Sequence, residues 1–389
     1  MFKEYYIALK LLNLSNEVII TIMKTLELSE IKLFFESDNI MEFQYKYNLN
    51  LNRYADILNN LNLKRSKLNE AVEIMNINKR LNIKTVLYIN KLYPERLREI
   101  NNPPAIIYIK GKNLNKNDLK SIACVGSRKI SKFGVTAIES IVKNLTMERF
   151  TIISGLAYGA DKTAHEVCLK QNGRTIAVVA HGLDMIYPKE HEIMAKMILE
   201  NGGTIISEYP VGTKIEKFRF VERNRIVSAL SSGILMAEAK EKSGTRHTID
   251  FALEQKKPIF VPLPVTKNEI NSLNFELIEN RQAIPIKYKS DFSIIVKKLG
   301  YKIKYNKEAV NNLKNNSLNN VILSLSKGTI DIDVTTLKNK NARTGFDVNK
   351  EEYMKFKNIL KENNLTLREF FNILIKCVIG IYEGEKRNE

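Results

Sequence analysis

Two glycine-bearing turns contain the residues of this chain that are best suited to bind a ligand. The stretch SIACVGSRKIS at 121–131 places Gly126 and Arg128 directly after a β-branched run, and TIISGLAYGADKTAH at 151–165 repeats the arrangement. A strand that ends in a glycine turn and starts a helix presents backbone N–H groups and the positive end of a helix dipole. Because an arginine lies in the first turn, the pattern predicts phosphate as the ligand.

Cations and aromatic residues gather in these turns and in the later turns of the same kind. The cations are Arg128, Lys129, Lys189, Arg219, Arg223, Arg225, Lys240, Lys242 and Arg246, and the aromatics are Tyr158, Tyr187, Tyr209, Phe218 and Phe220. Cations that track a backbone, with rings that stack on bases, are typical of single-stranded nucleic acid binding. Core packing explains each aromatic residue taken alone, and we favour it for Phe220.

The sequence contains no recognisable catalytic motif. It lacks a G-x-S-x-G elbow, a P-loop and any metal-ligand spacing. A Ser–His–Asp arrangement stays open, but Asp161 and His165, four residues apart, favour a helix cap and a helix-face hydrogen bond. Glu208 and Glu238 lie at strand ends and are either acid–base residues or anchors for backbone amides. We therefore expect no catalytic residue, no metal and no cofactor.

Alternating strands and helices must position these residues. Apolar, β-branched runs predict strands at 121–125, 151–154, 175–180, 204–207, 233–239 and 258–261. Helical periodicity lies between them, for example in Val135, Ile138, Val142 and Leu145. This order predicts an α/β fold with a doubly wound parallel sheet, whose ligands bind beyond the carboxyl ends of the strands. The unusual glycines and cations all fall at that edge.

Length, net charge and cysteine content indicate the class of protein to which this chain belongs. The chain has 389 residues, 44% of them hydrophobic, and a formal net charge of +18. The charge indicates a polyanion partner, although an AT-rich genome also produces Lys-rich chains. We expect neither a membrane span nor a signal peptide. Cys124, Cys168 and Cys377 are unpaired in spacing, which favours a reducing cytoplasm over a disulfide framework.

Four segments differ in composition. Residues 1–80 are helical in period and predict a small all-helical domain, and 81–296 hold the sheet after a connector with Tyr93-Pro94 and Pro103-Pro104. Residues 297–342, rich in Asn, Lys and Ser, predict a linker. Residues 343–389 predict a strand and two helices that resemble a ribbon-helix-helix module, with a helical hairpin as the equal alternative.

The order of the motifs resembles the DNA-processing protein A family (DprA/Smf). The matching stretches are YPERL at 93–97, NPP at 102–104, VGSR at 125–128, SGLAYGAD at 154–161, AHGLD at 180–184, YP at 187–188, SEYPVG at 207–212, RNRI at 223–226, EA at 238–239 and SGT at 243–245. They cover about two hundred residues in order and at sensible spacing. The segment 1–80 is compatible with that family's sterile-alpha-motif-like domain but has no signature of its own.

The resemblance implies a Rossmann-like domain that binds single-stranded DNA, dimerises and loads the recombinase RecA during natural transformation, without a defined catalytic activity. It implies that Arg128 is the DNA-binding arginine and Lys189 the lysine after YP. The positions where the family's backbone approaches DNA map to Gly126, Ser127, Ser154, Gly155 and Gly159. We add Lys129, Arg223, Lys242 and Arg246 to the predicted DNA-binding residues because of their charge and position.

Departures from the family pattern leave details of the site open. His191 stands where the family has Asn, Leu263-Pro264 replaces a PG pair, and the loop SGTRH adds Arg246. One alternative is a small-nucleotide-binding protein or nucleotide hydrolase, although the glutamate that such enzymes carry after the GT pair is missing. Another is a sequence-specific regulator that depends on the C-terminal segment.

Overall fold

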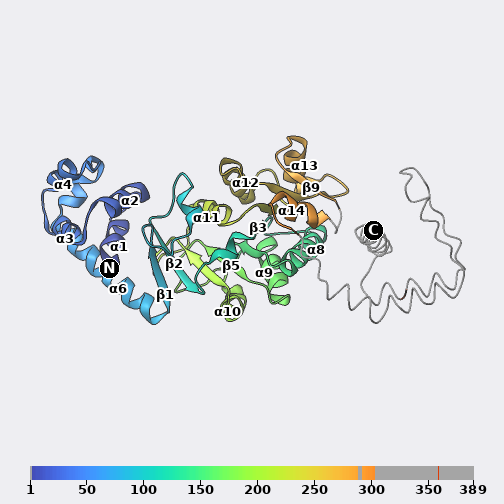
Figure 1. The fold of residues 1–389 in the computed structure, drawn as a ribbon, viewed down its shortest axis with the longest axis horizontal. Helices are drawn as coiled ribbons and strands as arrows, with labels where there is room; N and C mark the ends of the chain where they lie inside the picture. Colours follow the sequence, from blue (N-terminus) through green and yellow to red (C-terminus); the bar gives the residue numbers. More distant parts are fainter. Residues whose placement is uncertain (1, 288–290, 303–357, 359–389) are drawn as a thin grey trace, which may run out of the picture. The chain divides into compact units, whose positions relative to one another are not determined.

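The computed structural model describes residues 2–287, 291–302 and 358 (Figure 1). The chain begins with helices, as its periodicity predicts: α1 (Lys3–Leu11), α2 (Asn16–Thr25), α3 (Leu28–Glu36), α4 (Ile40–Tyr47), the 3₁₀ turn η1 (Asn52–Tyr54), α5 (Ala55–Asn59) and α6 (Leu61–Arg80). Side-chain caps fix two of the starts. Ser15 accepts from the Val18 N–H, and Asn60 accepts from the Leu63 N–H.

These helices share a core with the sheet. Ile7 and Leu9 of α1 belong to the same buried cluster as Ile106 and Tyr108, which lie on a sheet strand, and Ile198. All described residues up to 302 accordingly belong to one compact unit. The boundary at residue 80 stays a prediction.

A single sheet organises the rest of this unit. Its strands are β1 (Ile83–Leu87), β2 (Ile106–Gly111), β3 (Ser121–Val125), β4 (Thr151–Ser154), β5 (Thr175–Val179), β6 (Thr204–Ser207), β7 (Ile234–Met236), β8 (Ile259–Pro262) and β9 (Ile284–Ile286). Their order is β1-β2-β6-β5-β4-β3-β7-β8-β9. Every pairing from β6 to β9 is parallel, while β1 with β2 and β2 with β6 are antiparallel. The predicted α/β fold with a doubly wound sheet is confirmed.

The predicted connector before the sheet contains two of these strands. β1 and β2 pair in the register Val86↔Ile107 and extend the sheet beyond β6. The prolines at 94, 103 and 104 lie in the loop between the strands, where a missing N–H costs no ladder bond. Those prolines hid the strands because they dominate the composition of the segment.

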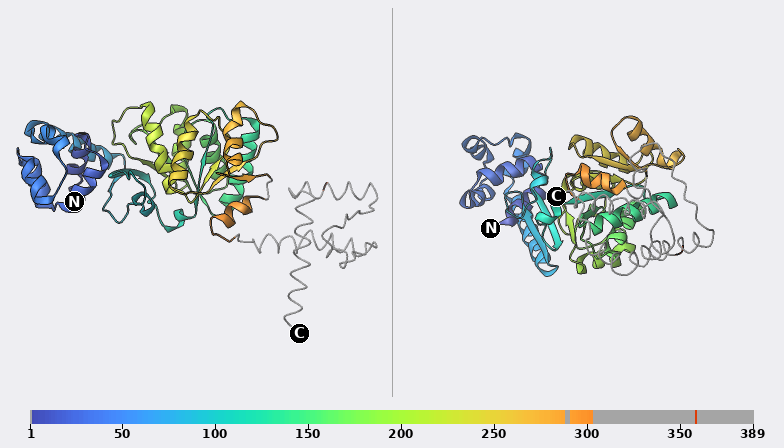
Figure 2. Two further views of the ribbon diagram at one scale, coloured as in Figure 1. Left: turned by 90° about the horizontal axis from the view of Figure 1, so that it is seen from above. Right: turned by 45° about the vertical axis from the view of Figure 1, so that its right-hand side comes forward.

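Helices cover both faces of the sheet (Figure 2). One face packs on α8 (Lys132–Met147), α9 (Ala160–Lys170) and α14 (Phe292–Lys298), and the other on α11 (Lys217–Leu230), α12 (Gly244–Glu254) and α13 (Ser272–Glu279). Along β3, Ile122 and Cys124 face the first group while Ala123 and Val125 face the second. Such strands, buried on both sides, explain the continuous apolar runs of the sequence.

The remaining elements are short or lie at the margins. They are α7 (Glu95–Arg98), α10 (Glu192–Glu200) and the 3₁₀ turns η2 (Lys116–Leu119), η3 (Lys189–His191) and η4 (Glu269–Asn271). After α14, the Tyr301 hydroxyl donates to the Leu119 carbonyl at 2.9 Å. The predictions for the rest of the linker and for the 343–389 module lie outside the described residues, except Asn358.

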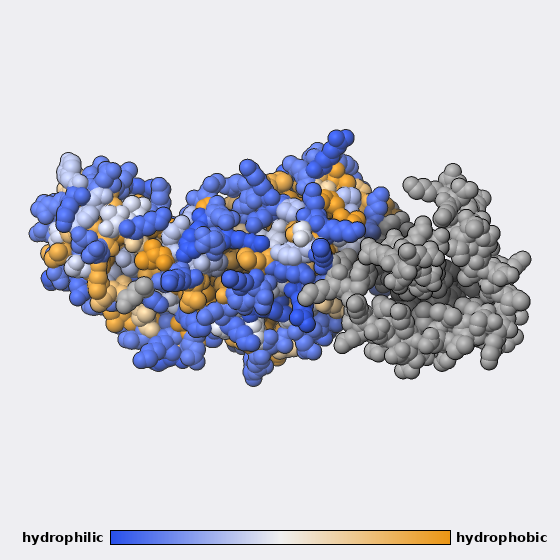
Figure 3. All heavy atoms as spheres, viewed as in Figure 1, coloured by the Kyte–Doolittle hydropathy of each residue, from blue (hydrophilic) through white to orange (hydrophobic). Residues whose placement is uncertain are grey.

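One face of the described residues is largely polar. On the face shown in Figure 3, hydrophilic side chains cover most of the coloured area and apolar side chains form separate patches. Within the described part of the chain, no helix combines the length and the apolar composition that crossing a bilayer requires.

The strand order reverses at β3. The chain moves from β3 to β4 on one side and later returns to β7 on the other. In open α/β sheets, the loops after the two strands at such a reversal enclose the usual ligand crevice. Here they are the loops after β3, at 126–131, and after β7, at 237–243.

Candidate nucleic-acid interface

Glu238 joins the two loops at the reversal point. Its carbonyl accepts from the Ser127 N–H at 2.7 Å, and its carboxylate accepts from the Ser131 N–H at 2.8 Å and the Ser131 hydroxyl at 2.9 Å. Glu238 is 2% exposed. It therefore anchors backbone amides at the start of α8, the second of the two roles that its position in the sequence suggested.

The loops after β3 and β4 also contact each other directly. The Ala160 N–H donates to the Ser127 carbonyl at 3.1 Å. Gly159 has φ +70°, and a Cβ there would lie 2.3 Å from the Ser127 oxygen. A Cβ on Gly126 would lie 2.8 Å from that of Ala160. Both glycines are needed for the contact between loops.

Several backbone N–H groups in these turns already donate to protein oxygens, whereas the sequence led us to expect N–H groups open to an anion. Asp161, 8% exposed, accepts from the N–H groups of Gly155 and Ala157 at 3.1 and 3.3 Å, and burial raises the pKa of its carboxyl group. The buried Ser154 hydroxyl donates to the Cys124 carbonyl. Ser154 and Gly155 thus lie beneath the surface of the loops, and their DNA-binding role stays a prediction.

Four of the predicted DNA-binding cations are exposed at this edge. They are Arg128, Lys129, Lys189 and Lys242, and within the described part of the chain none of them forms an ion pair. Unneutralised cations retain their full attraction for phosphates. The sequence predicted these residues but could not show that they lack ion-pair partners among the described residues.

Other predicted cations are already paired. Arg246 binds Asp250 at 3.0 Å and Glu276 at 2.7 Å. Lys240 pairs with Glu269, and Arg219 pairs with Glu216. Arg246 is therefore available to DNA only in competition with two carboxylates. Its role in binding stays a prediction.

Two arginines of α11 are buried rather than exposed. Arg225, 5% exposed, binds Glu208 at 2.7 Å and donates to the carbonyls of Asn102 and Glu222. Arg223, also 5% exposed, lies against Gly155, where a Cβ would come within 1.7 Å of its Nη1. Their charge did not reveal this burial in the sequence.

Aromatic side chains link the exposed cations. The Arg128 guanidinium lies 5.6 Å from the centre of the Phe220 ring, and the Phe220 and Tyr187 rings are 5.9 Å apart. Tyr187 precedes cis-Pro188 and Lys189. Phe220 is thus half-buried at the edge and contacts a cation, instead of lying in the core as we expected. Arg128 and the Lys189 segment meet through these two rings.

Tyr187 and Phe218 are exposed rings at this edge whose side chains form no hydrogen bond among the described residues. They are 40% and 53% exposed. Tyr158, 42% exposed, donates to Glu190 at 2.7 Å and joins the loop after β4 to η3. Tyr209 is buried, and its hydroxyl donates to Glu222. Stacking on exposed rings contributes about 1–3 kcal/mol per base in single-strand binders.

Glu208 and His165, two groups that could act as acid or base, have structural partners. Burial favours a raised pKa for Glu208, but Arg225, Lys10 and Asn16 outweigh it and lower the pKa. Burial lowers the pKa of His165 to about 3, and His165 Nδ1 lies 2.7 Å from the Thr175 hydroxyl. In the described ranges, His, Cys, Asp and Glu form no cluster that could hold a metal ion.

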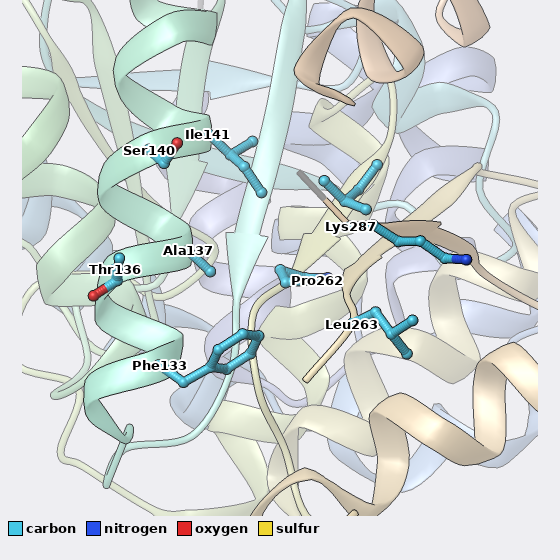
Figure 4. Close-up of a pocket in the computed structure, with 9 residues that line it drawn as sticks. Phe133, Thr136, Ala137, Ser140, Ile141, Pro262, Leu263 and Lys287 are labelled. Carbon is cyan, nitrogen blue, oxygen red and sulfur yellow. The ribbon is translucent and has the colours of Figure 1, made fainter. Parts of the chain in front are cut away.

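A groove of about 140 Å³ lies away from these cations, between α8 and the ends of β8 and β9 (Figure 4). Phe133, Ile141, Leu263 and Ile286 line it, and Lys287 is its charged residue. An apolar groove with one cation does not suit a polyanion, so the exposed cations define the candidate interface.

The sheet region of the chain is similar to known proteins. The model of the family described as DNA recombination-mediator protein A matches residues 84–297. Protein Smf of Synechocystis is 40% identical over 171 residues, which cover 43% of each chain. DNA processing protein DprA of Bacillus subtilis is 36% identical over 178 residues, 46% of this chain and 60% of that protein. The match therefore spans about half the length of these relatives.

Two solved structures of DNA processing protein A are similar to this chain. The X-ray structure of DNA processing protein A from Streptococcus pneumoniae superposes with a TM-score of 0.54 and 28% identity, over 67% of this chain and 95% of that chain. The DNA processing protein A of Helicobacter pylori, which binds single-stranded DNA, has a TM-score of 0.50 and 29% identity, over 56% and 97% of the two chains.

Proposed function

Since the chain belongs to the family of DNA recombination-mediator protein A, the DprA/Smf family, we propose that it binds single-stranded DNA along the carboxyl edge of its sheet. The observation that supports this most is the set of exposed, unneutralised cations: Arg128, Lys129, Lys189 and Lys242. The strand's phosphates contact these cations, and its bases stack on Tyr187 and Phe218. Contacts to phosphates and stacking read no base edges, so sequence preference is weak.

Fluorescence anisotropy of labelled poly-dT over a salt series tests this proposal. We expect Arg128→Ala to weaken binding at least tenfold, or about 1.4 kcal/mol. One lost phosphate contact also reduces the log–log salt slope by about 0.7. Arg65→Ala, an exposed arginine on α6 outside this edge, is the matched control for net charge. Equal loss in both variants, or equal affinity for duplex DNA, would show that the attraction is only diffuse.

A finer part of the proposal concerns the steps after the strand has bound. We propose that the protein acts as a homodimer, protects the bound strand and helps to load RecA onto it during natural transformation. Family membership supports this part. Light scattering tests the dimer, and nuclease protection and RecA filament assembly on single strands test the rest. RecA assembly that is unchanged by the protein would contradict the loading step.

The proposal includes no catalytic step. Glu238 holds the start of α8, and Glu208 is bound by Arg225 and Asn16. Both carboxylates at the strand ends of this edge are thus committed to protein contacts. Release of base from a nucleoside monophosphate would contradict a purely binding role and favour the nucleotide-hydrolase alternative.

A further inference from the structure

Two arginines on α11 have equal burial but opposite surroundings. Arg223 and Arg225 are each 5% exposed. Arg225 has a carboxylate and two carbonyls as acceptors, from Glu208, Asn102 and Glu222. Arg223 has no hydrogen-bond acceptor and no ion pair among the residues that the structure describes.

The guanidinium of Arg223 lies at the turn after β4. A Cβ on Gly155 would be 1.7 Å from its Nη1 and 2.4 Å from its Cζ. Nε is fully enclosed without a partner. The two terminal amino groups also lack acceptors among the described residues, but they are not fully enclosed.

No described carboxylate lies within ion-pair distance of Arg223. Asp161 attracts it electrostatically, yet no oxygen of Asp161 lies within ion-pair distance, and that carboxylate accepts from Gly155 and Ala157. Arg128 repels it. Burial of an unpaired guanidinium beside a second one is unfavourable, unless an anion completes the site.

We propose that Arg223 forms the floor of a recessed subsite for one phosphate group, with the exposed Arg128 at its rim. An arginine donates to two phosphate oxygens at once, which a lysine cannot do in this fixed geometry. The inference rests on the proposed function only in that the phosphate belongs to a DNA strand. The same chemistry is available from an internal phosphodiester or from a terminal phosphate.

Urea unfolding with and without inorganic phosphate tests the subsite in the absence of DNA. Arg223→Met keeps an apolar stem, so in phosphate-free buffer we expect it to be at least as stable as the wild type. Phosphate raises the unfolding midpoint of the wild type and leaves that of Arg223→Met unchanged. Arg225→Met, the equally buried control, is strongly destabilised because it removes the 2.7 Å ion pair of Glu208 and leaves that carboxylate with Lys10, at 3.8 Å, as its counter-charge. An Arg223→Met variant that is destabilised without phosphate and still gains from it would overturn the subsite.

Oligo-dT with a 5′-hydroxyl or a 5′-phosphate identifies the source of the phosphate. A loss of tenfold or more in Arg223→Met with both strands indicates an internal phosphodiester, and a loss with the phosphorylated strand alone indicates the terminus. No loss with either strand contradicts the subsite. If phosphate stabilises the wild type through Arg223 while Arg128→Ala binds DNA normally, the subsite stands and the proposed interface fails.

Discussion

Arg128 and Arg246 are both arginines of the carboxyl edge, but their surroundings give them different tasks. Arg128 extends into solvent over Phe220, whereas Arg246 is held between Asp250 and Glu276. The partner of Arg246 on α13 is 30 residues away in sequence. Such cations could be located in the sequence, since charge and strand ends are visible in it. The sequence could not show which of them are paired or buried, because pairing and burial depend on contacts between distant segments.

His165 makes stability depend on pH. It is fully buried, and burial lowers its pKa to about 3, below the value of about 6.5 in the unfolded chain. The unfolded state therefore takes up the proton first, and stability is complete above pH 6.5 and declines as the pH falls toward 3. This residue alone contributes a loss of about 1.4 kcal/mol between pH 7.5 and 5.5.

Urea titrations of wild type and His165→Gln at these two pH values measure that contribution. Other buried histidines, such as His181, titrate alike in both proteins. Their contributions to the pH dependence of stability therefore cancel when the two proteins are compared. A wild-type loss no larger than that of His165→Gln would show that His165 is protonated in the folded protein.

At the scale of elements, the loops after β3 and β4 depend on Gly159. Its φ of +70° and the 2.3 Å approach to the Ser127 oxygen exclude a side chain. We expect Gly159→Ala to lower the free energy of unfolding by about 2 kcal/mol or more, since a Cβ there is strained and also clashes with backbone. Gly244→Ala is the control, because a Cβ there meets nothing within 4 Å. Equal urea midpoints in the two variants would contradict the interlocking of the loops.

Strands with a clear apolar pattern in the sequence were predicted, and strands that are short or lie next to prolines were missed. The strands from Ser121 to Pro262 have the predicted order, because buried parallel strands are continuous apolar runs. Their bounds agree with the prediction to within a residue or so, except that β7 ends at Met236 and not at Ala239. β1 and β2 were missed because prolines mark the loop between them. β9 (Ile284–Ile286) was missed because it is three residues long and has a proline at its centre. Its register along β8 depends on tertiary contacts.

For the whole described unit, Glu208 connects parts that are far apart in sequence. Its carboxylate binds Arg225 of α11 at 2.7 Å and accepts from Asn16 of α2 at 2.9 Å. We expect Glu208→Gln to destabilise the protein by about 3 kcal/mol, because it leaves the buried Arg225 without its counter-charge. The urea midpoint measures this loss.

An exposed pair provides the comparison for Glu208. Glu200 and Lys196 are 3.7 Å apart, with exposed side chains. Glu200→Gln should change the midpoint little, since exposed ion pairs contribute little to stability. If both glutamine variants unfold alike, Glu208 does not join the helices to the sheet.

The hydrogen bonds of Glu238, Ser127 and Ala160 also have a kinetic consequence. Loops that are already joined to one another need no ordering when a strand arrives, so little entropy is lost at that step. Diffusion and the field of the exposed cations then set the association rate, whereas short-range contacts set how long the complex lasts. We therefore expect added salt to slow capture of a strand far more than it hastens release.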